Sequence, residues 1–189
     1  PLFESGHHGY DTSNYYQVDR RLGDNALFAQ FCSRAHELGI RVILDGVFNH
    51  VGRSFFAFQD VLRNRQNSTF CGWFSGLRFD LDNKSRDGFC YDTWDGYENL
   101  VKLNLSNEHV RSHLFGAVKQ WIDEFGIDGL RLDAANVIDK GFLSDLAHFT
   151  KSIKTDFWLM GEVVAGDYNQ WANPDRLNSV TNYEAYKGL

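Results

Sequence analysis

A short apolar run near the middle of the sequence ends in a charged pair. The run contains Leu130 and Leu132, and it leads into Asp133. Arg131 lies two residues before this carboxylate, so the period of a strand places both side chains on one face. A guanidinium beside a carboxylate favours the ionised form and fixes its orientation. Asp133 is therefore a candidate nucleophile, and a structural ion pair at the end of a strand is the alternative.

Two further acids follow apolar runs in the same way. Ile40 to Leu44 precedes Asp45, and Phe157 to Gly161 precedes Glu162. In parallel α/β folds the carboxyl ends of the strands carry the active site. One strand–helix unit of roughly thirty residues separates Asp133 from Glu162, so both should end neighbouring strands. Neighbouring strands lie about 4.8 Å apart, close to the roughly 5–5.5 Å between the two carboxyl groups of retaining glycosidases.

The elements expected to position these acids alternate between helices and buried strands. The spacing of apolar residues predicts helices over 25–38, 107–125 and 139–154. Apolar runs predict strands over 41–45, 127–132, 157–161 and 179–183. This alternation is typical of a parallel sheet with right-handed crossovers. The first 24 residues are rich in Gly, His, Asp, Asn and Tyr, and we expect a loop there after a strand end at residues 1–3.

Residues 51–104 interrupt this rhythm and form an inserted segment. The segment is unusually rich in Phe, Tyr and Trp. Sugars offer apolar C–H faces that stack on such rings, but most of these rings should form the small core of the insertion itself. A complete eight-stranded barrel typically takes about 250 residues. A chain of 189 residues with such an insertion should therefore contain only part of a barrel.

Composition argues against several classes of function. The formal net charge is −6 without a basic cluster, so nucleic acid is not an expected partner. No apolar run is long enough to cross a bilayer and no secretory signal is visible, so no membrane partner is expected and a cytoplasmic location is favoured. The first residue is Pro1 and not Met, so we expect the true N-terminus to be missing. The cysteines Cys32, Cys71 and Cys90 should be free thiols, with a Cys71–Cys90 bridge as the alternative.

Metal-binding patterns are weak. His109 and His113 lie four residues apart on a predicted helix, but the glutamate of a zinc protease motif is missing between them. We expect both histidines to be solvated. The adjacent residues His7 and His8 are interpreted as a pair in a loop.

Four stretches of the chain resemble the α-amylase family, glycoside hydrolase family 13. In chain order they are Gly-Tyr-Asp-Thr at 9–12, Asp-Gly-Val-Phe-Asn-His at 45–50, Gly-Leu-Arg-Leu-Asp-Ala-Ala-Asn at 129–136 and Gly-Glu-Val at 161–163. The resemblance implies an α/β fold, a partial (β/α)8 TIM barrel of about strands 3 to 6. Residues 1–50 would hold the end of strand 2 and strand 3, residues 51–104 the inserted domain after strand 3, and residues 105–189 strands 4 to 6.

The resemblance also implies a role for each candidate residue. Asp133 would be the nucleophile beside Arg131, and Glu162 would be the general acid and base. Tyr10 would stack on a sugar ring, and His50 would hydrogen-bond a sugar hydroxyl. Further supporting or substrate-binding residues would be Asp45, Asp11 and Asn136. No cofactor is required for this chemistry. Calcium binds some relatives, and Asn49 is either structural, which we favour, or a calcium ligand.

Smaller signatures are similar to the neopullulanase and cyclomaltodextrinase branch of the family. They are Leu-Val-Lys-Leu-Asn at 100–104, Phe-Gln-Asp-Val-Leu at 58–62 and Cys-Gly-Trp-Phe at 71–74. The chain departs from that branch at Val137, which replaces a usual Glu, and at 163–165, which replace a usual Trp-His. Both positions would face the leaving-group sugars. The expected partner is thus an α-glucan, either starch, maltooligosaccharides, cyclodextrins or pullulan, and a homo-oligomer is left open.

Two other functions fit the same motifs. One is an α-glucan transglycosylase, and the other is a non-catalytic amylase-like protein kept for binding or assembly. The presence of Asp133, Glu162 and Arg131 together favours an enzyme. We also expect these 189 residues alone to be catalytically silent, because the third catalytic carboxylate of the family would lie beyond Leu189.

Overall fold

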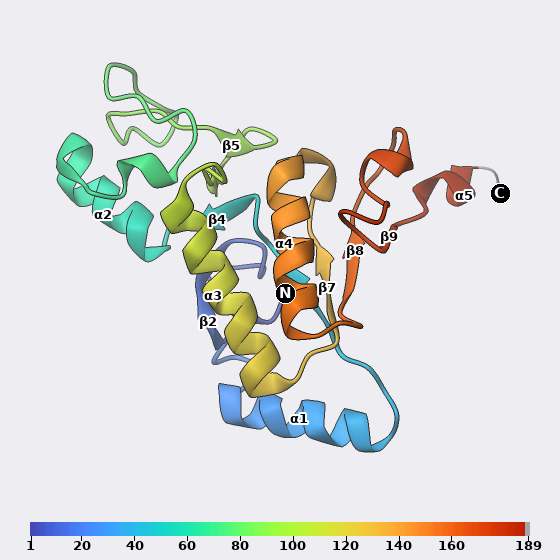
Figure 1. The fold of residues 1–189 in the computed structure, drawn as a ribbon. Coiled ribbons are helices and arrows are strands. Elements are labelled where there is room, and N and C mark those ends of the chain that lie inside the picture. The colour runs from blue at the N-terminus through green and yellow to red at the C-terminus, as the bar shows by residue number, and fades with distance from the viewer. Residues whose placement is uncertain (188–189) are drawn as a thin grey trace.

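A four-stranded parallel sheet forms the centre of the computed structural model, which describes residues 1–187 (Figure 1). In spatial order its strands are β3 (Ile43–Gly46), β7 (Gly129–Leu132), β8 (Trp158–Gly161) and β9 (Ser179–Val180). Asp45 pairs with Arg131, and Leu132 pairs with Gly161. This register ends β3, β7 and β8 at one edge, where the predicted acids follow.

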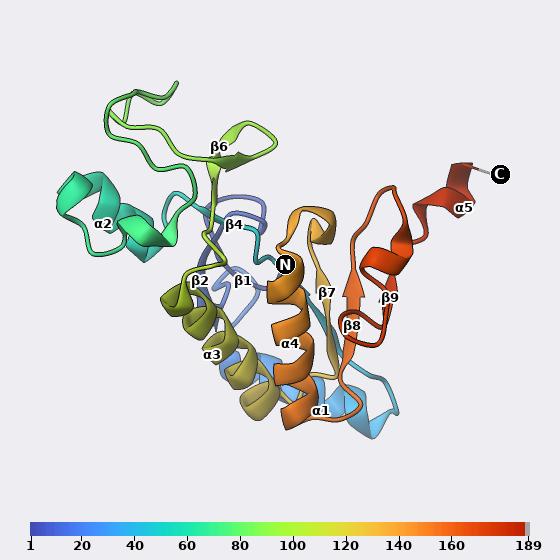
Figure 2. The same cartoon turned by 45° about the horizontal axis from the view of Figure 1, so that its top comes forward.

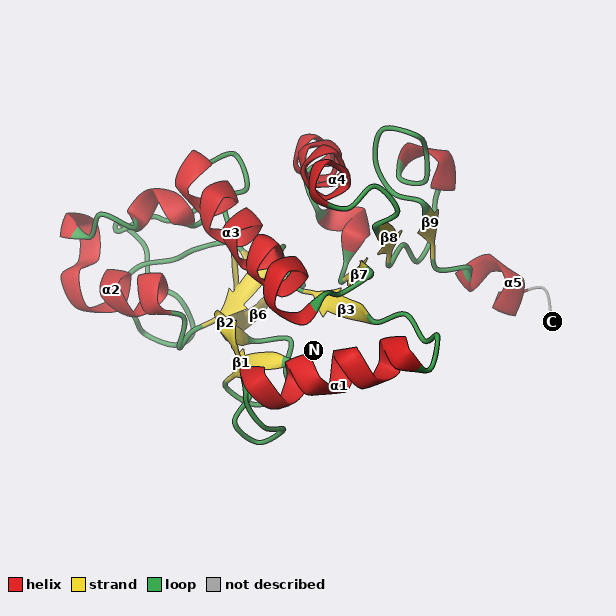
Figure 3. Cartoon of the chain, turned by 60° about the horizontal axis from the view of Figure 1, so that its bottom comes forward, coloured by secondary structure: helices red, strands yellow, loops and turns green. Residues whose placement is uncertain are grey.

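Three long helices connect and cover these strands, at the positions that the sequence predicts. They are α1 (Asn25–Glu37), α3 (Glu108–Phe125) and α4 (Lys140–Ile153). The side chains of Asp24, Asn107 and Asp139 cap their N-termini by accepting backbone N–H groups. Gly126 ends α3 in a left-handed conformation with φ 67°, which glycine adopts without steric cost. The helix α3 packs against both α1 and α4 (Figure 3).

The inserted segment forms its own small sheet and helices at the carboxyl end of the parallel sheet (Figures 1 and 2). Its antiparallel sheet has the order β4 (His50–Gly52), β6 (Tyr97–Lys102) and β5 (Thr93–Trp94). Its helical pieces are α2 (Phe56–Asn64), η1 (Arg65–Asn67) and η2 (Cys71–Trp73). Most of its rings are buried, as predicted, but the prediction of a separate small core is wrong, because Phe55 contacts Tyr15 and joins the insertion to the main core. The buried rings are Phe55, Phe58, Trp73, Phe74, Phe89 and Tyr91. Cys32, Cys71 and Cys90 are free thiols.

The first 24 residues differ from the expected loop. They contain a two-stranded antiparallel sheet, β1 (Phe3–Ser5) and β2 (Thr12–Val18). Contacts from distant segments hold it: the Tyr15 hydroxyl donates to the Val47 carbonyl at 2.6 Å, and Trp121 Nε1 donates to the Tyr15 carbonyl at 2.8 Å. The expected loop was wrong because these partners lie far away in the sequence.

The remaining elements are short. They are η3 (Ala135–Val137), η4 (Tyr168–Gln170) and α5 (Tyr183–Lys187). The strand predicted over 179–183 is limited to its first two residues, because the chain turns into α5 at Tyr183. No helix in the described part of the chain is both long and apolar enough to cross a membrane.

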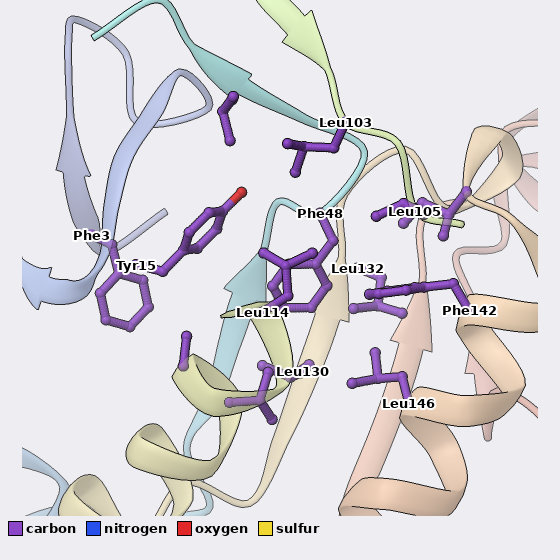
Figure 4. Packing of buried hydrophobic residues seen from close by; sticks show 14 of the residues in the cluster. Phe3, Tyr15, Phe48, Leu103, Leu105, Leu114, Leu130, Leu132, Phe142 and Leu146 are labelled. Atoms are coloured by element: carbon purple, nitrogen blue, oxygen red, sulfur yellow. The ribbon is translucent and has the colours of Figure 1, made fainter. Parts of the chain in front are cut away.

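The main core lies between the helices and the parallel sheet (Figure 4). Leu130 and Leu132 of β7 are fully buried, together with Leu114 of α3 and Phe142 of α4. Because side chains alternate along a strand, this packing directs Arg131 to the opposite face. The core therefore determines the direction in which the candidate site opens.

Candidate active site

One guanidinium group joins the three acids at the carboxyl edge of the sheet. Arg131 Nη1 donates to Asp45 Oδ1 at 2.7 Å and to Asp133 Oδ1 at 3.1 Å. Arg131 Nη2 lies 2.7 Å from Glu162 Oε2. The predicted contact between Arg131 and Asp133 is thus present. The structure adds that Arg131 is shared among the acids of three neighbouring strands.

Burial controls the electrostatics of Asp133, which is only 8% exposed. Desolvation raises its pKa, Arg131 opposes this, and the charges of Asp45 and Glu162 raise it further, to about 6. Arg131 favours the ionised form of Asp133, as expected, but desolvation outweighs this effect and leaves the pKa above the ordinary value of an aspartate. The guanidinium is divided among three carboxylates, whereas desolvation acts on Asp133 in full. The ionised form still predominates at pH 7, as a nucleophile requires.

Glu162 is held by three groups from different parts of the chain. In addition to the ion pair with Arg131, its Oε2 accepts the Ala134 N–H at 3.1 Å, and its Oε1 accepts the Tyr183 hydroxyl at 3.0 Å. Ala134 has φ 47° and ψ 41°, a left-handed conformation that costs a residue with a β-carbon roughly 1–2 kcal/mol. Such strain is common at functional sites. The residue after Asp133 thereby connects the two catalytic candidates.

A cavity of about 420 Å³ lies beside the acids. Tyr10 lines it together with Arg131, Asp133 and Glu162, so the structure brings Tyr10 to the same place as both candidate catalytic acids. Burial raises the pKa of the Tyr10 phenol, and the neighbouring Asp45 raises it further. The other lining residues are His8, His50, Trp94, Tyr97, Asn99 and Leu100.

His50 is almost completely buried in the wall of this cavity. Its Nδ1 lies 3.2 Å from Asn49 Nδ2, and its Nε2 has no hydrogen-bond partner within residues 1–187. Burial lowers the pKa of His50 to about 4, although the Tyr10 backbone opposes the shift. The imidazole is therefore neutral at pH 7. An unpartnered ring nitrogen at this position is suited to a ligand hydroxyl.

The other predicted residues surround the acids without joining them. Asp11 is 3% exposed and accepts the backbone N–H groups of His7 at 2.8 Å and His8 at 3.2 Å, so it organises the loop that carries Tyr10. Asn49 is 2% exposed and contacts His50. Across residues 1–187, no three His, Cys, Asp or Glu side chains are grouped as a metal site, and calcium binding stays an untested prediction.

A second cavity of about 320 Å³ lies on another side of Glu162. Asn136 lines it, and so do Val137 and Val164, two positions where the sequence departs from its branch of the family. The exposed valines are 45% and 48% accessible. The remaining lining residues are Asn49, Thr93, Trp94, Asp95, Lys102 and Ala134.

Three aromatic residues at the site were not singled out by the sequence. Trp94 and Tyr97 line the first cavity, and Tyr183 hydrogen-bonds Glu162. Trp94 and Tyr97 belong to the insertion with its many other rings, and Tyr183 has Tyr186 beside it, so the sequence offers no signal that distinguishes the three.

The prediction that both helix histidines are solvated is only half right. His109 is exposed, but His113 packs among the rings of Tyr15, Tyr16, Phe55, Phe56 and Trp73. Burial lowers the pKa of His113. The inserted segment covers this face of α3, which helical periodicity alone does not reveal.

Comparisons with known proteins agree with these motifs. The family model described as "Alpha amylase, catalytic domain" matches residues 1–188. A cyclomaltodextrinase from Geobacillus thermopakistaniensis is 39% identical across 97% of this chain and 31% of its own length. Neopullulanase 2 from Thermoactinomyces vulgaris is 38% identical across 97% of this chain and 31% of its own length. An intracellular maltogenic amylase from Bacillus subtilis is 33% identical across 97% of this chain and 30% of its own length.

A solved structure gives the same result for the fold. Cyclic α-maltosyl-(1→6)-maltose hydrolase from Arthrobacter globiformis superposes with a TM-score of 0.91 and 32% identity, over 99% of this chain and 42% of that protein. The chain spans about a third of the length of the curated relatives it matches. Its parallel sheet and covering helices are part of a TIM barrel, as predicted. The chain belongs to the α-amylase family of glycoside hydrolases.

Proposed function

We propose that this chain carries the nucleophile and the acid/base of a retaining glycoside hydrolase that acts on α-glucans. The observation that supports this most is the shared contact of Arg131 with Asp133 and Glu162 beside a cavity large enough for a sugar ring. Retaining enzymes hold their two carboxyl groups about 5–5.5 Å apart, and the contact of both candidates with one guanidinium on neighbouring strand ends supports double displacement over inversion.

The first step would form a bond between Asp133 and the anomeric carbon. Glu162 would at the same time give its proton to the departing glycosidic oxygen, so that the leaving sugar ends in a hydroxyl group. In the second step Glu162, now a carboxylate, would take a proton from water, and the water oxygen would displace Asp133. Tyr10 would support the ring that is attacked, and the free Nε2 of His50 would contact one of its hydroxyls.

The anomer that is released first tests the stereochemical part of the proposal. The full-length polypeptide that carries this sequence should release the α-anomer from a maltooligosaccharide, as NMR of the first product would show before mutarotation. First release of the β-anomer would overturn double displacement. Absence of any glucan cleavage would favour the alternative of a non-catalytic binding protein.

The choice of glucan rests on the relatives and on the second cavity. Three curated relatives are named cyclomaltodextrinase, neopullulanase and intracellular maltogenic amylase, and we propose the same substrate class and an intracellular location for this protein. Val137 and Val164 make the second cavity partly apolar, which also suits a sugar acceptor, so transglycosylation is the competing activity. Product analysis on cyclodextrin, pullulan and starch separates these outcomes: longer products indicate transfer.

A further inference from the structure

The tip of the inserted sheet presents an aromatic pair to the site. Strands β5 and β6 form a hairpin in which Trp94 pairs with Tyr97. The two turn residues, Asp95 and Gly96, have φ values of 49° and 78°. Two consecutive positive φ values define a type I′ turn, whose twist matches that of a tight hairpin, and Asp-Gly is a favoured sequence for it. The turn therefore sets where the two rings lie.

The two rings contact each other and line the cavity beside the acids, and neither belongs to the buried hydrophobic core. Their centroids are 5.9 Å apart at an interplanar angle of 19°, and Trp94 also lies 5.8 Å from the His50 ring. Tyr97 is 55% exposed. An added Cβ on Gly96 would meet no atom within 4 Å, so the tip of the hairpin lies in open space. Trp94 is only partly buried, and the exposed Tyr97 ring gains little from burial in the folded chain, so both rings leave apolar surface for a ligand.

Trp94 has a position that no other aromatic residue of the site shares. Within the described residues 1–187, the cavity with Asp133 and the cavity with Val137 share two lining residues, Trp94 and Glu162. Tyr97 lines only the cavity with Asp133. The indole and the acid therefore lie together at the junction of the two cavities.

We propose that Trp94 is a substrate-binding residue that stacks on the glucan on both sides of the bond that is cleaved. The inference rests on the proposed function, in which Glu162 protonates the bridging oxygen between two sugars. Those sugars would occupy the two cavities, and among residues 1–187 the two that line both cavities are Glu162 and Trp94. α-Linked glucose units expose apolar C–H faces that fit a flat ring. Tyr97 would support only the sugar that Asp133 attacks.

Two substrates with different leaving groups test the proposal in the full-length polypeptide. Maltotetraose has a sugar on both sides of the cleaved bond, whereas 4-nitrophenyl α-maltoside has no sugar as its leaving group. Trp94→Ala should lower kcat/KM for maltotetraose by about tenfold or more, and for the aryl glycoside by several-fold less. Tyr97→Ala is the matched control and should lower both values by the same factor.

Two further variants distinguish loss of the Trp94 ring from misfolding of the Trp94→Ala protein. Trp94→Phe keeps a flat ring and should recover most of the activity on maltotetraose, whereas Trp94→Leu keeps an apolar side chain and should not. Equal losses on both substrates for Trp94→Ala would overturn the two-sided contact, and so would unchanged kcat/KM for maltotetraose. An unmodified protein that cleaves neither substrate would instead refute the proposed function.

Discussion

At the scale of single residues, the site depends on how one positive charge is divided. Arg131 contacts Asp45, Asp133 and Glu162, so it compensates each carboxylate only in part. Asp133 is the most buried of the three and has a pKa of about 6, because desolvation outweighs its contact with Arg131. If Asp133 is the nucleophile, as we propose, this pKa sets a lower limit to the pH at which the enzyme works.

The activity of the full-length polypeptide should therefore decline as the pH falls through about 6. In the proposed mechanism Asp133 must be ionised to attack, and it gains its proton near that value. We expect kcat/KM between pH 4 and 8 to show an acid limb centred near pH 6. An acid limb centred near pH 4 would show that burial does not control the pKa of Asp133.

Asp133→Asn should lower kcat at least about a thousandfold while glucan binding persists.

Tyr183 should act as a positioning residue for the acid. Its hydroxyl donates to Glu162 Oε1 at 3.0 Å, so Tyr183→Phe removes one hydrogen bond and little volume. The substitution should lower kcat/KM for a maltooligosaccharide about tenfold, the value of one hydrogen bond to a charged group. A 4-nitrophenolate leaving group needs little protonation, so the effect on an aryl maltoside should be much smaller. Equal losses on both substrates would indicate a purely structural role.

The residues of the site divide into those that the sequence reveals and those that it does not. Asp133 and Glu162 could be predicted because a carboxylate directly after a buried strand is unusual and the pattern recurs. The places of Trp94 and Tyr183 beside the acids could not be predicted, because they depend on a turn and on a contact with a distant strand end. The raised pKa of Asp133 also required the structure, since burial and sharing of Arg131 are tertiary properties.

At the scale of elements, one buried carboxylate connects the amino-terminal ends of the strands. Asp128 precedes β7, and its Oδ2 accepts the Val42 N–H at 2.7 Å and lies 2.9 Å from His36 Nε2 at the end of α1. Its Oδ1 accepts Lys154 Nζ at 2.7 Å, just after α4. Burial alone would raise the pKa of Asp128, but these contacts outweigh it and lower the pKa to about 2.

Asp128→Asn should destabilise the protein at neutral pH by about 2 kcal/mol. The folded state has the lower pKa, so ionised Asp128 stabilises the fold above pH 4, and this contribution disappears as the pH falls through about 2. Urea unfolding of both forms at pH 7 and at the lowest pH where they remain folded measures the difference. A difference that does not shrink in acid would mean that packing, and not charge, is responsible.

Asp133→Asn should have the opposite effect on stability. The pKa of Asp133 is higher in the folded state, so its ionisation opposes folding and the cost is complete above about pH 6. The substitution should raise the free energy of unfolding by about 1–3 kcal/mol at pH 8 and change it little at pH 4. Urea unfolding at both pH values checks this. Destabilisation at pH 8 would show that the favourable interaction between Arg131 and ionised Asp133 exceeds the desolvation cost of the Asp133 carboxylate.

The elements that the sequence predicts well are those with a strong local pattern. The helix α3 has a regular apolar stripe, a capping Asn107 and a terminal Gly126, and its predicted limits hold. The strand β2 was missed because its residues are mostly polar and its pairing depends on Tyr15 reaching the core. The expectation that His113 is solvated was likewise wrong, because helical periodicity does not reveal that Phe55 and Trp73 of the inserted segment cover its side chain.

At the scale of the whole molecule, the parallel sheet has two open edges, β3 and β9. An apolar surface runs along α1 and its flanks, where large side chains are about half exposed or more; these are Leu22, Leu27, Phe31, Leu38, Ile40 and Ile43. Beside it is a hollow of about 390 Å³ lined mainly by apolar residues. A closed barrel has no open edges, and open edges with apolar patches favour association.

The 189-residue chain by itself should therefore be inactive and should self-associate. The acids are in place, but the chain spans about a third of its curated relatives, and four parallel strands cannot close a barrel around the substrate. Light scattering during size-exclusion chromatography should show species larger than 21.7 kDa, and an assay on maltooligosaccharides should show no turnover. Replacing Phe31 and Leu38 with Ser or Asn should reduce association, because it removes exposed apolar surface. It should not restore activity, because it does not supply the missing barrel strands. Clear turnover by a monomer of the unmodified chain would contradict this prediction. It would show that the acids at these three strand ends catalyse the reaction without the remaining strands of a barrel.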